Sequence, residues 1–245
     1  MAIFLKKMKI RLFTIPNMLT LGNLACGASA TIALLSNGDF KLAFYLVVAS
    51  AIFDFLDGFA ARLLKSSSAI GVQLDSLADM VSFGLTPSVA MFCWYNNAPL
   101  ISSQLPENVV NYGAYIMLII VAFSALRLAK FNIDDTQYAE FCGLPTPANG
   151  LFCLSLAMLA NAGDITLAKE IIVAISIIMA CLLISPIRMF ALKFHGFGWK
   201  GNEIRYSFIF LCIAIITFFS TFAIPTIILL YIIISTLRWA IKLRK

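Results

Sequence analysis

Four aspartates lie close together in an apolar part of the chain, at Asp54, Asp57, Asp75 and Asp79. The protein has only 12 acidic residues, so a third of them fall in this short stretch. An ionisable side chain inside a membrane segment is costly and marks a functional site by default. Four carboxylates can be neighbours as anions only if cations join them, and no His or Cys lies between Asp54 and Asp79. Hard oxygen ligands of this kind favour Mg²⁺ or Mn²⁺ over zinc or copper.

The spacing of the aspartates places each pair on one face of a helix. Asp54 and Asp57 are three residues apart, and Asp75 and Asp79 are four apart, which are the separations of helical neighbours. If the two helices form a hairpin, Asp57 lies at the level of Asp75, and Asp54 at the level of Asp79. Four carboxylates in two tiers nearly balance two divalent ions, and a two-metal site orients and neutralises a diphosphate.

Small residues beside the aspartates suggest a binding hollow. Gly58 and Ala61 share the helix face of Asp54 and Asp57, and their lack of bulk leaves space for a flat ring. Arg62 follows at the mouth of this hollow, where a guanidinium can bind phosphate. Small residues also allow membrane helices to pack closely, which is the competing explanation for Gly58 and Ala61. The four neighbouring aspartates favour the hollow.

The composition is that of an all-α polytopic membrane protein. The 245 residues are 61% hydrophobic and only 12% charged, whereas a soluble domain carries about 25% charged residues. A run of about 17–25 apolar residues is long enough to cross a bilayer. Eight such runs are expected, at 16–36, 41–62, 71–94, 109–131, 146–163, 168–190, 206–221 and 224–241.

The basic residues indicate how these spans are oriented. With both termini on one side, 16 of the 18 Lys and Arg residues lie on that side. Basic residues concentrate on the cytoplasmic side, so both termini and the aspartates' end of the hairpin are expected to face the cytoplasm. The net charge of +6 then reflects topology and does not indicate nucleic-acid binding. Residues 1–14 form a basic, amphipathic juxtamembrane segment suited to anionic membrane lipids.

The residues around the aspartates also follow a known pattern. The spacing D-x-x-D-G-x-x-A-R-x₈-G-x-x-x-D-x-x-x-D is complete here, and it resembles the signature of the CDP-alcohol phosphotransferases. The resemblance implies that a CDP-linked lipid is attacked by the hydroxyl of an acceptor alcohol, with release of CMP. It implies roles for the signature residues: Asp54, Asp57 and Asp75 as metal ligands, Asp79 as ligand and general base, and Gly58, Ala61 and Gly71 as the residues that make room for cytidine. It also suggests a homodimer.

Four further stretches, at 15–24, 74–84, 127–132 and 143–150, resemble the phosphatidylserine synthase subfamily. That resemblance implies a CDP-diacylglycerol–serine O-phosphatidyltransferase of the cytoplasmic membrane, with CDP-diacylglycerol and L-serine as substrates. The carboxylate of serine needs a cationic partner, and Arg127 and Lys130 are candidates, with Asn132 as a polar contact. Membrane anchoring is the competing explanation for the two cations. Asn23, a polar residue in an apolar run, could face the cytidine or the metals.

The expected organisation is therefore a six-helix catalytic core over 15–200, followed by two additional helices over 201–245 whose role is open. Glycerol 3-phosphate or inositol phosphate as acceptor is the nearest alternative, because both would also require cations. A divalent cation transporter is an alternative of another class. Transporters often contain inverted repeats and broken helices, and neither is evident around this hairpin.

Overall fold

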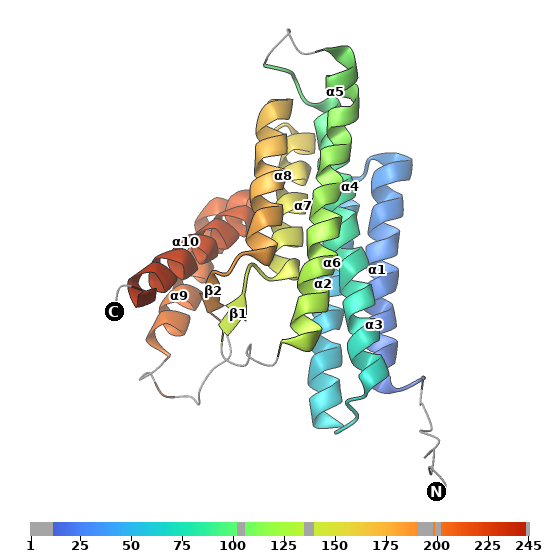
Figure 1. The fold of residues 1–245 in the computed structure, drawn as a ribbon, viewed down its shortest axis with the longest axis vertical. Coiled ribbons are helices and arrows are strands. Elements are labelled where there is room, and N and C mark those ends of the chain that lie inside the picture. Colours follow the sequence, from blue (N-terminus) through green and yellow to red (C-terminus); the bar gives the residue numbers. More distant parts are fainter. Residues whose placement is uncertain (1–11, 102–105, 135–139, 191–197, 199–201, 244–245) are drawn as a thin grey trace, which may run out of the picture.

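The computed structural model describes residues 12–101, 106–134, 140–190, 198 and 202–243, which form a mostly helical bundle (Figure 1). Two long helices, α1 (Ile15–Asn37) and α2 (Phe40–Leu63), pack extensively against each other. A continuous helical segment follows, made of α3 (Ala69–Asp79), the π-helical turn η1 (Met80–Leu85) and α4 (Thr86–Asn97). The next segment consists of α5 (Glu107–Gly113), the 3₁₀ turn η2 (Ala114–Leu118) and α6 (Ile119–Ile133).

The second half of the chain adds four helices and two very short strands. Helices α7 (Thr146–Ala162) and α8 (Lys169–Ile184) complete the core with α4 and α6. Strands β1 (Glu140–Cys142) and β2 (Arg188–Phe190) pair in antiparallel register. Helices α9 (Glu203–Phe219) and α10 (Ala223–Leu243), joined by η3 (Ser220–Phe222), pack together beside the bundle and are inclined to it (Figure 1).

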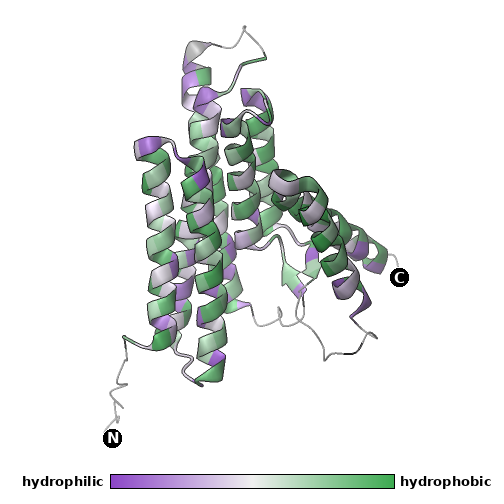
Figure 2. Ribbon diagram, turned by 180° about the vertical axis from the view of Figure 1, so that it is seen from behind, coloured by the Kyte–Doolittle hydropathy of each residue, from purple (hydrophilic) through white to green (hydrophobic). Residues whose placement is uncertain are grey.

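Most of the helical surface is apolar, as expected of an integral membrane protein. Figure 2 shows hydrophobic residues along most of each helix and hydrophilic residues chiefly near the helix ends. Large side chains such as Phe210 and Phe218 are 77% and 83% exposed, which suits contact with lipid. Five helical segments of the described residues are long and apolar enough to cross a membrane: 15–37, 40–63, 69–97, 110–133 and 203–243.

The structure agrees with part of the expected span pattern. Helices begin within three residues of all eight expected starts, and the fourth expected start lies two residues inside α5. Helices α7 and α8 have 17 and 16 residues, and both are shorter than the five segments that are long enough to cross a membrane. The full count of eight spans therefore stays a prediction. The expected segment 1–14 lies outside the described residues except for 12–14.

Two boundaries differ from the expected ones. The sixth span was expected to reach residue 190, but α8 ends at Ile184, because Pro186 cannot continue a helix and holds Ser185 in an extended conformation with ψ 153°. Residues 188–190 form a short strand instead, and apart from β1 and β2 the described residues form the expected all-α fold. The reversal between α9 and α10 was expected at 221–225 and begins at Ser220, whose φ is +42°.

Helix α1 approaches the middle of the central helical segment very closely at Gly27. A Cβ atom at Gly27 would overlap the backbone and side chain of Ser82 in η1. The neighbouring Thr86 hydroxyl donates to the Gly27 carbonyl over 3.0 Å. These contacts fix α1 against η1 and the start of α4. Such π-helical turns often occur at functional sites.

We therefore expect Gly27→Ala to destabilise the protein by about 1–3 kcal/mol, as overpacking does elsewhere. Thermal unfolding in a mild detergent, followed by circular dichroism, measures the effect as a lower Tm. Gly58→Ala is the matched control, since Gly58 is also helical but a Cβ there meets nothing within 4 Å. Equal melting temperatures for the two variants would contradict the close approach of α1.

Candidate active site

Three of the four aspartates form one cluster between α2 and α3. Single carboxylate oxygens of Asp54, Asp57 and Asp75 all lie within 4.8 Å of one another. Asp57 is buried, and the other two are half-buried. Asp54 and Asp75 are also close electrostatic neighbours, so a cation between them would offset their like charges. The hairpin expected from the sequence thus brings these three carboxylates together.

Asp79 lies next to this cluster and has a different partner. It is 7% exposed, and its Oδ1 accepts a hydrogen bond of 3.0 Å from the Asn23 amide. Asp54 and Asp75 are its electrostatic neighbours. Asp54, which the spacing predicts at the level of Asp79, thus lies close to both Asp79 and Asp75.

One face of α1 supplies polar partners to the aspartates. Thr20 donates its hydroxyl proton to Asp57 Oδ2 over 2.5 Å, and Asn17 lies beside the same cavity. Asn17, Thr20 and Asn23 recur every three residues and are almost fully buried. Sequence reasoning identified Asn23 as a candidate but missed Asn17 and Thr20. Their helical spacing was the signal that could have identified them.

Asn23 is itself fixed by two serines. Ser82 of η1 donates to Asn23 Oδ1 over 2.7 Å, which leaves the Asn23 amide group directed at Asp79. Ser50 of α2 donates to the Asn23 carbonyl over 3.0 Å. Asn23 is not among the residues that line the cavity beside the aspartates. In this structure it orients Asp79 by connecting α1, α2 and the central helical segment.

A cavity of about 130 Å³ opens beside Asp57 and Asp75. The predicted residues Gly58, Ala61 and Gly71 all contribute to its wall, whereas Arg62 is exposed and is not part of the lining. A Cβ at Gly58 would meet nothing within 4 Å, so the space in front of it is open. The complete lining is Pro16, Asn17, Thr20, Asp57, Gly58, Ala61, Ser66, Ser67, Ser68, Gly71, Val72 and Asp75.

The donor atoms of the cluster suit a hard divalent cation. All three clustered groups are carboxylates, the ligand class preferred by Mg²⁺ and Mn²⁺. The buried Oδ1 of Asp75 has no hydrogen-bond partner among the described residues. A buried acceptor without a donor is costly, and a bound cation would satisfy it. Asp54, Asp57 and Asp75 are therefore the residues that would hold a metal ion.

Arg127 of α6 is a buried cation close to the aspartates. It is only 8% exposed, and its electrostatic partners include Asp79 and Asp54. Its Nη1 donates to Thr146 Oγ1 over 2.6 Å, and its guanidinium lies 5.6 Å from the centre of the Phe131 ring. Such burial does not suit an arginine that serves only as a membrane-surface anchor.

The other two predicted acceptor residues lie farther along α6. Asn132 donates to the Ser76 hydroxyl over 2.8 Å, so it contacts α3 next to Asp75. Lys130 is exposed, and its Nζ lies 3.6 Å from Cys142 Sγ. Of the three residues, Arg127 has the closest electrostatic relation to the aspartates.

The fold and the site define a helical membrane protein with a carboxylate cluster suited to a metal ion and a buried cationic residue near it. A family model described as CDP-alcohol phosphatidyltransferase matches residues 13–185. The match covers more than half of the chain, and the chain belongs to this family.

Several relatives of this chain share one name. The chain is similar to proteins named CDP-diacylglycerol–serine O-phosphatidyltransferase from three organisms. It is 28% identical to one from Helicobacter pylori over 93% of this chain and 92% of the relative. It is 33% identical to one from Methanocaldococcus jannaschii, covering 73% and 74%, and 33% identical to one from Bacillus subtilis, covering 60% and 77%. The H. pylori match covers 93% of this chain, and the residues it leaves uncovered are fewer than those of α9 and α10 together. The match therefore extends into this helix pair.

We expect Asp75→Asn to weaken Mn²⁺ binding by about tenfold or more, because it removes a charged ligand from a cluster of three. Electron paramagnetic resonance titration of free Mn²⁺ against the purified protein measures this without any substrate. Asp164→Asn is the control, since it removes the same charge at the end of α7, outside the cluster. Equal Mn²⁺ affinity in the two variants would contradict the assignment of the cluster as the metal site.

Proposed function

We propose that this protein transfers the phosphatidyl group from CDP-diacylglycerol to L-serine, giving phosphatidylserine and CMP. The observation that carries the choice of serine is the buried Arg127 beside the aspartates, taken together with the name that the relatives share. A guanidinium held in a sheltered site is suited to the carboxylate of an amino-acid acceptor.

The metal-dependent part of the reaction is assigned to the aspartates. Asp54, Asp57 and Asp75 hold Mg²⁺ or Mn²⁺, with Asp79 completing the site, and two ions would nearly balance the four carboxylates. When bound, the ions neutralise the diphosphate and make a nearby hydroxyl more acidic. Gly58, Ala61 and Gly71 leave space for the cytidine, and the exposed Arg62, next to Ala61 in the chain, is assigned to the diphosphate.

The proton of the acceptor is assigned to Asp79. Its Oδ1 is held by Asn23, which orients the carboxylate toward the other aspartates. The hydroxyl oxygen of serine attacks the phosphorus that bears the diacylglycerol, the bond from that phosphorus to the CMP oxygen breaks, and Asp79 takes the hydroxyl proton. Arg127 binds the serine carboxylate, while Lys130 and Asn132 lie farther along the same helix.

The orientation and the assembly are part of the proposal. Sixteen of 18 basic residues on one side support cytoplasmic termini and an active site that opens to the cytoplasm, where serine is soluble. Residues 15–200 are the catalytic six-helix core, residues 201–245 are an addition to it, and the family suggests a homodimer. A cation transporter is not favoured, because the chain belongs to a transferase family.

The acceptor is tested with purified protein in mixed micelles of lipid and detergent. With CDP-diacylglycerol and Mn²⁺, we expect CMP release on addition of L-serine and little release with glycerol 3-phosphate or inositol phosphate. Chromatography of the nucleotides gives CMP, and mass spectrometry of the lipids identifies the product. If CMP is released with glycerol 3-phosphate but not with serine, serine is not the acceptor, although the reaction type of the family still holds.

Asp79→Asn should lower kcat by a factor of about 100 or more, since a general base contributes about 10²–10⁴ in rate. Binding of CDP-diacylglycerol should change much less, because the clustered Asp54, Asp57 and Asp75 remain. Asp164→Asn serves again as the charge-matched control. Turnover of Asp79→Asn close to that of wild type would exclude Asp79 as the base.

A further inference from the structure

The two short strands form a tie between the active-site helices and the C-terminal helix pair. We call β1 and β2 together the β-strap. In its register, Glu140 is opposite Phe190 and Cys142 is opposite Arg188. The Gly143 and Leu144 amides continue the tie by donating to the carbonyls of Ile187 and Leu182, both over 2.9 Å. Gly143 has φ +82°, and a Cβ there would overlap the Leu183 carbonyl, so only glycine fits.

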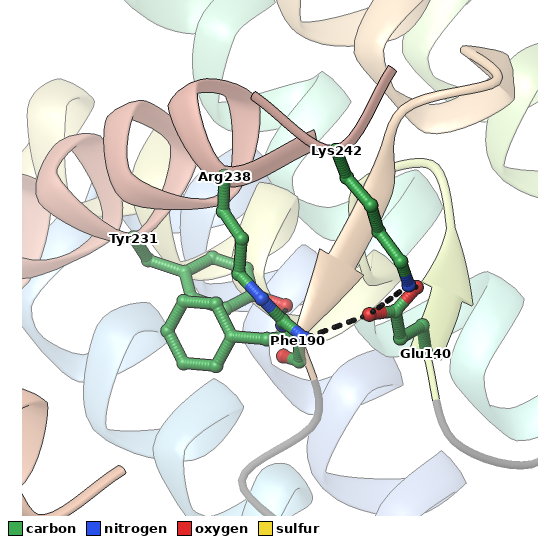
Figure 3. A network of polar contacts seen from close by, with 5 residues as sticks. All are labelled: Glu140, Phe190, Tyr231, Arg238 and Lys242. Carbon is green, nitrogen blue, oxygen red and sulfur yellow. Dashed lines mark hydrogen bonds and ion pairs between the residues drawn. The ribbon is translucent and has the colours of Figure 1, made fainter. Parts of the chain in front are cut away.

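Helix α10 holds the β-strap through three side chains (Figure 3). Arg238 Nη2 lies 2.9 Å from Glu140 Oε1, and Lys242 Nζ lies 3.5 Å from both oxygens of Glu140. The Tyr231 hydroxyl donates to the Phe190 carbonyl over 3.0 Å. Tyr231, Arg238 and Lys242 are seven and four residues apart, so they share one face of the helix. The strap is thus bound to α10 at both of its strands.

The other side of the β-strap contacts the helix that carries Arg127. The Phe141 ring lies 6.2 Å from the ring of Phe131, which also lies under the Arg127 guanidinium. Cys142 lies next to Lys130, and the chain then runs four residues to Thr146, whose hydroxyl accepts from Arg127. Thr146 and Phe131, which contact the Arg127 guanidinium, therefore both lie next to the strap.

Charge and burial both strengthen the contact between Glu140 and α10. The Glu140 side chain is 18% exposed, and the Arg238 side chain is 38% exposed, so water screens the pair only in part. Two cations meet one carboxylate, and charge-assisted hydrogen bonds of this kind are stronger than neutral ones. The family match ends at residue 185, before β2, so it does not account for this contact.

We propose that α10 is a positioning element of the acceptor site. Through Glu140 it fixes the β-strap, and through Phe131 and Thr146 the strap fixes the direction of Arg127 toward Asp79 and Asp54. Glu140 and Arg238 are positioning residues, since neither touches the aspartates. The proposal rests on the proposed function in one respect, which is that Arg127 receives the carboxylate of the acceptor.

The test compares Arg238→Gln and Glu140→Gln in the full-length protein with wild type. We expect each variant to raise the KM for serine about fivefold, the effect of losing a partly exposed ion pair. The KM for CDP-diacylglycerol and kcat should stay within about twofold of wild type, because the aspartate cluster is untouched. The double variant Glu140→Arg with Arg238→Glu should restore the serine KM. Lys41→Gln, which removes an exposed cation at the start of α2, is the charge control.

A second measurement does not depend on turnover. In a protein whose other five cysteines are replaced, Cys142 of the β-strap reports on its local opening through its rate of reaction with a maleimide. We expect this rate to rise about fivefold in Arg238→Gln and to return to the wild-type value in the charge-swapped double variant. An unchanged rate means that α10 does not hold the strap and overturns the proposal.

The outcomes separate this proposal from the proposed function. Wild-type protein that does not use serine refutes the proposed function, and the labelling rate then still decides whether α10 holds the strap. If Arg127→Ala raises the serine KM selectively but Arg238→Gln does not, the proposed acceptor site stands and the positioning role of α10 is wrong. Equal increases in both KM values, or a loss of kcat alone, also overturn that role, since they indicate general damage to the fold.

Discussion

Burying carboxylates of one sign among apolar helices costs free energy unless cations and hydrogen-bond donors surround them. The arrangement of this bundle follows from that constraint. The clustered carboxylates lie on α2 and α3, and the hydroxyl and amide groups of Thr20 and Asn23 approach them from α1. Arg127 of α6 adds a positive charge nearby. Helices α1 and α6 thus stabilise the carboxylates in two different ways, by hydrogen-bond donors and by charge.

The donors can act only because the helices approach closely and remain in register. Gly27 lets α1 lie against η1, and at that point Ser82 donates to Asn23 and so determines which end of the amide faces Asp79. An α-helix would continue past this point with a different side-chain direction, whereas the π-helical turn shifts the positions that follow it. The local geometry of η1 is therefore linked to the orientation of a proposed catalytic group, Asp79, about one helical turn from the cavity-lining Asp75. Rigidity of this kind favours the fixed ligand placement that metal-assisted chemistry needs.

Much of this fold was predictable from the sequence, and the exceptions have physical reasons. Long apolar runs and the prolines near helix starts determine where most helices begin, and the three- and four-residue spacing of the aspartates predicts their common cluster. The β-strap was missed because strands of three residues carry no periodic pattern and pair across 45 intervening residues, between Cys142 and Arg188. The burial of Arg127 was also beyond the sequence, since a basic residue near the end of a span looks the same whether it meets lipid headgroups or a carboxylate. The roles of Asn17 and Thr20 depend on which way α1 faces, and only packing decides that.

The position of the β-strap bears on how this protein is divided into parts. The family-model match ends at residue 185, between β1 and β2, although the similarity to the H. pylori relative extends farther. A chain cut at residue 185 would keep Glu140 but lose the strand beside it and both cations that meet its carboxylate. The end of the family-model match is therefore not a boundary in this structure, because the sheet and the ion pairs of Glu140 cross it.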